Sequence, residues 1–115
     1  MLLVLATGFC TKGFSQTSSV QRGQALYQSR CTACHAIDTH QTGPAHRGVM
    51  GRRAGSAANY KYSDELANST LVWTPNTLNA WLTDPEKLIP GQRMGFQVDS
   101  RKERADLIAY LATLK

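Results

Sequence analysis

The sequence has 115 residues and a formal net charge of +5, with 13 basic and 8 acidic side chains, and this length is enough for one domain with a modest hydrophobic core. Small basic proteins bind nucleic acids, anionic membranes or acidic patches on other proteins. The lysines and arginines form no dense run and do not alternate with aromatic residues, so the sequence argues against nucleic acid and favours acidic protein partners.

The segment from Met1 to Cys10 is apolar but too short to span a bilayer, and the residues that follow it are small and polar. This order is typical of a secretory signal peptide. We therefore expect residues 1–16 to be a signal peptide and residues 17–115 to form the functional domain. In a bacterium that domain would be exported to the periplasm, with no stable membrane anchor. The alternative is an ordered N-terminal strand.

A helix is predicted for residues 19–30. Ser18 and Gln21 have the spacing of a capping box at its start, and its apolar residues recur at helical spacing. Gly23 is unfavourable inside a helix by about 1 kcal/mol relative to alanine. A glycine here would let another helix cross closely.

Cys31 and Cys34 follow this helix, and His35 comes directly after them. This spacing is the attachment signature of a c-type haem. Each thiol can add to a haem vinyl group, and one helical turn would place both sulfurs at the same edge of the ring. The sequence therefore predicts one covalently attached haem c, with His35 as an axial ligand of the iron.

Two other sites use cysteines at this spacing. A thioredoxin-like pair opens a helix after a hydrophobic strand, whereas a polar helical segment precedes Cys31 here. A zinc site would need four ligands, for which Cys31, Cys34, His40 and His46 are the candidates. The cysteine pair and the histidine pair are far closer together in sequence than in the common zinc finger, so we favour a haem site.

Residues 39–55 are predicted to form an irregular loop, because glycine and proline are too frequent there for a helix. Arginines stand between the glycines. The loop could wrap one face of a haem and bring an arginine to its propionates. The alternative is a plain solvated loop.

Three further helices are expected. A short one spans about 63–69, and a second begins with Thr74 as its N-cap and ends before Pro85. Ser100 and Glu103 have the spacing of another capping box, at the start of the last helix. No segment alternates like a strand for long, so the predicted fold class is all-α.

A six-coordinate haem would need a second axial ligand. Met94 follows a Pro-Gly turn, in an irregular loop that could cross a haem face, although methionine is more often a core residue. His40 and His46 lie close to His35 in sequence, and Met50 lies among glycines and arginines. The residues alone leave Met94 as the first candidate and His46 as the second.

In combination and in order, several motifs resemble those of class I cytochromes c, over residues 23–114. The resemblance implies a monomeric all-α fold in which the first and last helices cross, and in which short helices and glycine-rich loops wrap one covalent haem. The motifs are Cys31-Thr-Ala-Cys-His35, Thr42-Gly43-Pro44, Gly51-Arg52 with Gly55, Tyr62, Trp73, Pro90-Gly-Gln-Arg-Met94 and Asp106-Leu-Ile-Ala-Tyr110-Leu111.

The resemblance also implies roles for single residues. His35 and Met94 would be the axial ligands, and the Pro44 carbonyl would accept the other N–H of His35. Gly23, Tyr27, Leu107 and Tyr110 would form the crossing of the terminal helices. The other haem-binding residues would be Arg52, Tyr62 and Trp73 at the propionates, Trp81 beside the methionine and Phe96 at the haem edge.

Some positions depart from the family pattern. His46 replaces an apolar residue beside the proximal face, so it either turns to solvent or lies in an altered pocket. Arg93 replaces a lysine before the methionine, and Leu66 stands where asparagine is common. Glu86 places an acid where lysines usually rim the haem edge.

The resemblance implies an electron carrier and not an enzyme. It would accept one electron from a reductase and pass it to a terminal acceptor, through redox partners with acidic docking patches. Two protein ligands would leave no open position on the iron. The alternative is a haem enzyme or gas sensor with a labile sixth ligand, acting on peroxide or nitrogen oxides, for which the sequence offers no obvious distal acid–base residue.

Overall fold

The computed structural model describes residue 8 and residues 17–115. The expected signal peptide, with Cys10, lies outside the described residues except for Gly8. Within 17–115 there are five helices and a single isolated bridge between Arg53 and Val72, which agrees with the predicted all-α class. None of the described helices has the length and apolar character needed to cross a membrane. The helices are α1 (Ser19–Arg30), α2 (Asp64–Ala67), α3 (Pro75–Thr83), α4 (Pro85–Leu88) and α5 (Arg101–Leu111).

Helix α1 begins and ends where the sequence predicts. The Ser18 hydroxyl accepts the backbone N–H of Gln21 at 3.2 Å, and the Gln21 side chain accepts the N–H of Ser18 at 3.0 Å. Cys31 is the C-cap, and its N–H donates to the carbonyl of Tyr27 at 2.9 Å. The predicted capping box is confirmed, and the helix delivers the chain directly to the first cysteine.

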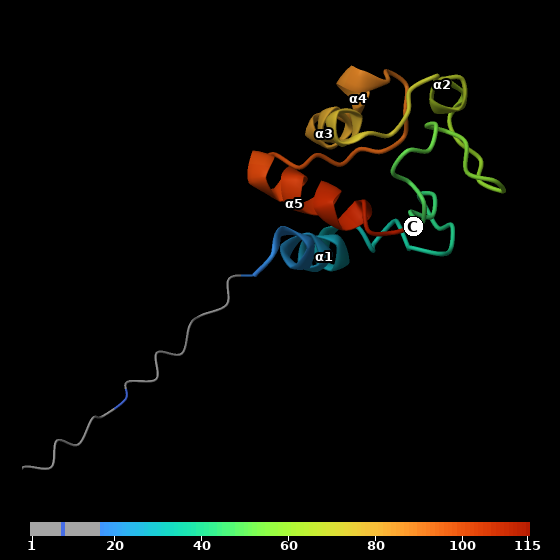
Figure 1. Cartoon of the computed structure of the whole chain (residues 1–115). Coiled ribbons are helices and arrows are strands. Elements are labelled where there is room, and N and C mark those ends of the chain that lie inside the picture. Colours follow the sequence, from blue (N-terminus) through green and yellow to red (C-terminus); the bar gives the residue numbers. More distant parts are fainter. Residues whose placement is uncertain (1–7, 9–16) are drawn as a thin grey trace, which may run out of the picture.

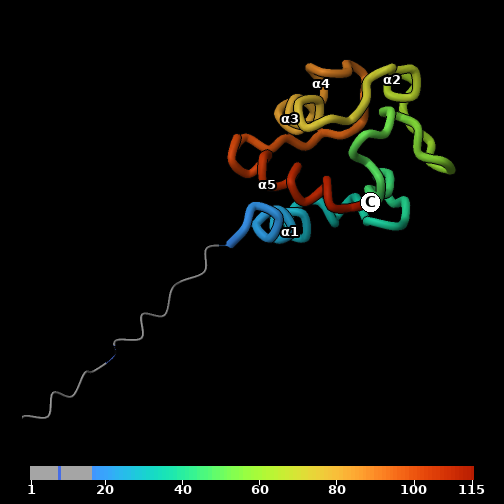
Figure 2. The backbone as a smooth tube through the Cα atoms, in the orientation of Figure 1, coloured from blue at the N-terminus to red at the C-terminus, as the bar shows by residue number. Residues whose placement is uncertain are grey.

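Helices α1 and α5 cross closely, and α5 lies between α1 and α3 (Figure 1, Figure 2). A Cβ atom added at Gly23 would lie 1.9 Å from the backbone oxygen of Asp106 and 2.8 Å from the Cβ of Tyr110. Only glycine fits at this contact. The rings of Tyr27 and Tyr110 meet there with their centroids 5.3 Å apart, and Leu107 is fully buried. The predicted crossing of the terminal helices is confirmed.

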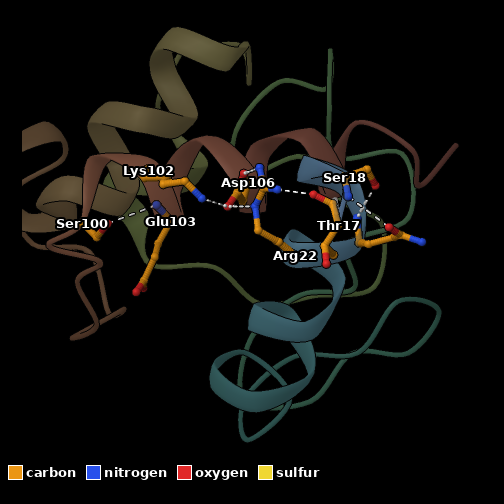
Figure 3. A network of polar contacts seen from close by, with 8 residues as sticks. Thr17, Ser18, Arg22, Ser100, Lys102, Glu103 and Asp106 are labelled. Carbon is orange, nitrogen blue, oxygen red and sulfur yellow. Dashed lines mark hydrogen bonds and ion pairs between the residues drawn. The ribbon is translucent and has the colours of Figure 1, made fainter. Parts of the chain in front are cut away.

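An ion pair that the sequence analysis did not identify joins the same two helices (Figure 3). Arg22 donates two hydrogen bonds to the carboxylate of Asp106, at 2.9 and 3.1 Å. The Lys102 ammonium lies 3.7 Å from the same carboxylate. The hydrogen bond from Arg22 is the main reason why the pKa of Asp106 is lowered.

The predicted capping box of the last helix is only half correct. The Ser100 hydroxyl accepts the N–H of Glu103 at 3.2 Å (Figure 3). The Glu103 carboxylate does not return to the N-cap backbone, because it pairs with Arg30 in the last turn of α1. The glutamate therefore joins two helices instead of closing its own.

The middle of the chain holds one helix more than predicted. Thr74 caps α3 as expected, and the short helix predicted for about 63–69 is α2, which Ser63 caps. After α3, the side chain of Asp84 accepts the N–H of Lys87 at 3.2 Å and starts α4, with Pro85 in its first turn. An aspartate followed by a proline favours a helix start, whereas Pro85 was expected only to end the preceding helix.

Candidate haem site

Both cysteines lie on one turn that follows α1. The N–H groups of Cys34 and His35 both donate to the carbonyl of Cys31, at 3.1 and 2.9 Å. Neither cysteine forms a disulfide; Cys31 is partly buried and Cys34 is exposed. A single turn therefore presents two unpaired thiols and an imidazole.

The arrangement differs from that of a thioredoxin-like pair. Cys31 closes a helix instead of opening one. Burial raises the pKa of its thiol to about 11, whereas redox-active pairs hold one thiol at a lowered pKa.

The histidines considered for zinc have other partners. His40 Nε2 is 2.7 Å from the carbonyl oxygen of Ala58, and His40 Nδ1 accepts the N–H of Ala45 at 3.0 Å. His46 is hydrogen-bonded to Tyr27. Within residues 17–115, no group of three or more His, Cys, Asp or Glu side chains is placed to hold a metal ion.

The His35 imidazole is held on two sides. Its Nδ1 lies 2.8 Å from the carbonyl oxygen of Pro44, so Nδ1 carries the proton and donates it. A Cβ added at Gly43 would lie 2.2 Å from Cε1 of the ring, so this glycine allows the backbone to rest against the imidazole. Burial lowers the pKa of His35. Because Nδ1 is engaged with Pro44, Nε2 is the ring nitrogen left free to coordinate iron.

His46 is packed against His35 and is not turned to solvent. The two rings are stacked, with centroids 4.1 Å apart and planes 24° apart. His46 Nδ1 lies 2.8 Å from the hydroxyl of Tyr27. Burial lowers the pKa of His46 to about 3, with smaller contributions from His35 and Arg52. If His35 is an axial ligand, a ring stacked on it cannot also reach the opposite face of the haem, so the stacking argues against His46 as the second axial ligand.

Met94 lies on the segment that follows α4, and it packs against the hydrophobic core. The Glu86 carboxylate accepts the N–H of Gly91 at 2.8 Å and the side-chain N–H of Gln92 at 3.2 Å. The amide oxygen of Gln92 in turn accepts the N–H of Met94. Glu86 was considered only as a surface charge from the sequence, but the structure places it as the anchor of the methionine loop.

Two of the expected propionate residues have partners within the protein. The Arg52 guanidinium donates to the carbonyl oxygens of Arg47 and Ala45, both at 3.2 Å. The Tyr62 hydroxyl accepts the N–H of Ala57 at 3.1 Å. The two hydrogen bonds from Arg52 lie within the loop of residues 39–55, and they leave the other donors of the guanidinium available.

Three aromatic residues named for the site fall into two groups. Trp73 and Trp81 are buried and pack edge to face, with their ring centroids 5.3 Å apart. Phe96 is 40% exposed. The structure therefore brings the two tryptophans together in the core and leaves Phe96 at the surface.

The donor set fits a covalent haem. Two unpaired thiols and an imidazole with one free nitrogen lie on one turn, and a glycine leaves room against that imidazole. A methionine in a separate anchored loop could supply a thioether sulfur as a further ligand.

Known proteins resemble this chain over most of its length. Residues 20–115 match the family model described as Cytochrome c. The chain is 41% identical over 98 residues to cytochrome c of Euglena viridis, which covers 83% of this chain and 96% of that protein. It is 41% identical over 97 residues to cytochrome c2 of Rhodopila globiformis, covering 81% and 91%.

A solved structure shares the fold. Cytochrome cH from Methylobacterium extorquens superposes with a TM-score of 0.76 at 39% identity, over 80% of this chain and 95% of that one. The likeness therefore extends over nearly all of the described residues.

Proposed function

Because this chain belongs to the class I c-type cytochromes of the cytochrome c family, we propose that it carries single electrons between redox proteins through a haem iron ligated by His35 and Met94. Members of this family are electron carriers with one covalently bound haem c. Cys31 and Cys34 would hold that haem as thioethers. The bound haem supplies the one-electron ferric–ferrous couple.

The observation that supports the ligation most directly is the orientation of His35. Its Nδ1 is tied to the Pro44 carbonyl at 2.8 Å, so only Nε2 can face the iron. The hydrogen bond also raises the basicity of the ligand. Met94, anchored through Gln92 and Glu86, would close the other face.

The remaining residues would control the surroundings of the haem. Trp73 and Trp81 exclude water from the core beside the site, and a dry site favours the less charged ferrous state. Arg52 would direct its free donors at the propionates. Two protein ligands would leave no open iron position, and the comparisons do not favour the alternative of a haem enzyme or gas sensor.

Partner docking would be electrostatic and transient. The cations Arg53, Lys61, Lys87 and Arg93 are exposed, and such charges attract partners with acidic docking patches. The carrier would act as a monomer. We place it in the periplasm of a bacterium, with residues 1–16 as the signal peptide, although its relatives come from eukaryotes as well as bacteria.

An absorption spectrum of the ferric holoprotein tests the ligation. We expect a low-spin spectrum with a methionine–iron charge-transfer band. Met94→Leu should abolish the band, and the matched variant Met50→Leu should keep it. A band that persists in Met94→Leu would contradict the proposal, as would a high-spin wild-type spectrum. Acid–acetone extraction tests the covalent attachment, because a thioether-linked haem should stay with the protein.

A further inference from the structure

His46 stacks on His35, at a position where the resemblance to class I cytochromes c implies an apolar residue. We propose that His46 is a positioning residue, which sets the plane of the His35 imidazole about its bond to the iron. The inference rests on the proposed ligation by His35. It concerns the rotation of the ligand ring, which that ligation alone does not determine.

The other two contacts of His35, the hydrogen bond to Pro44 and the close approach of the Gly43 backbone, restrain this rotation only in part. The hydrogen bond from Nδ1 to the Pro44 carbonyl directs Nε2 toward the iron. A single hydrogen bond tolerates tilting of the ring, because its angular dependence is broad. A flat ring stacked 4.1 Å away, with its plane 24° from that of His35, opposes rotation, since turning His35 would drive its edge into His46.

His46 is itself held firmly enough to act as this support. Its Nδ1 is hydrogen-bonded to the Tyr27 hydroxyl at 2.8 Å, and its backbone N–H donates to the carbonyl of Ala36 at 3.1 Å. Tyr27 is 2% exposed and packs on Tyr110 at the crossing of α1 and α5. The orientation of the axial ring is thereby coupled to the packing of the terminal helices.

An aliphatic side chain could fill the same volume but could not perform this role. It has no flat face to stack on the imidazole and no acceptor or donor for the Tyr27 hydroxyl. The plane of an axial histidine governs how unpaired spin spreads over a ferric haem, so its orientation can be read from the shifts of the haem methyl protons.

The test is proton NMR of the ferric holoprotein, comparing the order and spread of the haem methyl resonances. We expect His46→Leu to change this pattern and Tyr27→Phe to change it in the same direction by less. His46→Phe keeps a flat ring and should stay closer to the wild type than His46→Leu does. Tyr110→Phe is the matched control, because it removes a hydroxyl at the same crossing that is not bonded to His46, and it should leave the pattern unchanged.

The outcomes separate this inference from the proposed function. A wild type without the methionine–iron band would overturn the ligation. A wild type with the band, but with the same methyl pattern in His46→Leu, would overturn the positioning role alone. If the His46 variants yield no holoprotein, Tyr27→Phe decides, and a pattern equal to that of Tyr110→Phe would overturn the proposal.

Discussion

Arg22 and Asp106 are joined by two hydrogen bonds across the crossing of α1 and α5, although they are far apart in sequence. The Asp106 side chain is 6% exposed, whereas that of Arg22 is 37% exposed. The pair therefore lies at the border of the core, where solvent screens it only in part.

Because of this ion pair, the free energy of unfolding should decrease at acid pH. The pKa of Asp106 is lowered in the folded protein, mainly by the hydrogen bond from Arg22. An unfolded aspartate titrates near about 3.9. The ion pair therefore stabilises the folded protein above about pH 4. This stabilisation is lost as the pH falls through the pKa that Asp106 has in the folded state. Urea unfolding between pH 7 and pH 2 should show a smaller loss of stability in Asp106→Asn than in the wild type.

Asp38 provides the control for this measurement. It pairs with Arg47, and both side chains are more than half exposed. Exposed pairs contribute little, so Asp38→Asn should follow the wild-type profile closely. Identical profiles for Asp106→Asn and Asp38→Asn would contradict the argument.

The close contact at Gly23 should make this position of α1 intolerant of any residue larger than glycine. An added Cβ would meet the backbone oxygen of Asp106 at 1.9 Å, and a backbone atom cannot move away as a flexible side chain can. Gly23→Ala should lower the free energy of unfolding by about 3 kcal/mol or more, at the upper end of the usual overpacking range. Gln24→Ala is the control, because Gln24 is an exposed position of the same helix. Equal stabilities of the two variants, measured by urea unfolding, would show that the helices can separate.

Glu86 should affect both docking and the methionine loop. Because it is an acid near a basic surface, Glu86→Lys should raise the bimolecular rate with an acidic redox partner by about threefold at low salt. The gain should shrink as salt shortens the screening length to about 8 Å at physiological ionic strength. The same substitution removes the acceptors of Gly91 and Gln92, so the methionine–iron band should weaken.

Glu86→Gln separates these effects. It removes the charge but keeps one amide oxygen, so the rate should rise by less and the band should stay closer to the wild type. Stopped-flow rates over a salt series, with spectra of each variant, provide the measurement. A rate that is unchanged by Glu86→Lys at every salt concentration would refute the docking argument.

The features that could be predicted from the sequence depend on short-range rules. The limits of α1 follow from Ser18 and Gln21, because a capping box needs only residues three apart. The crossing at Gly23 could be anticipated, because glycine inside a helix is otherwise unfavourable. The resemblance to class I cytochromes c indicated that the last helix is the one that crosses α1 at this glycine.

The features that were missed depend on contacts between distant segments. The sequence gives no sign that Glu103 leaves its own cap for Arg30, because that choice depends on how α1 and α5 are placed. The inward position of His46, which lies in a loop, likewise depends on Tyr27 in helix α1. Only α4 had a local signal that the sequence analysis did not use, namely Asp84 before Pro85.

The last prediction concerns the ferric protein at high pH, where a deprotonated lysine can replace a methionine ligand. Arg93, beside Met94, cannot serve because a guanidinium stays protonated. Lys87 is exposed in α4, on the same segment as Met94 and ahead of the Pro-Gly turn, so we expect it to be the replacing ligand.

Because of the residues around Met94, the replacement of Met94 by lysine should occur only at high pH. Trp81 is buried, and Leu66 packs against the same core; such apolar walls make it unfavourable to admit water or a charged amine. Titration of the methionine–iron band should therefore give a higher midpoint in Lys87→Ala and a lower one in Leu66→Asn than in the wild type. Lys102→Ala is the control for Lys87, because Lys102 pairs with Asp106 on α5. Overlapping curves for the wild type and Lys87→Ala would exclude Lys87 as the ligand, and an unmoved midpoint in Leu66→Asn would refute the argument from the apolar pocket.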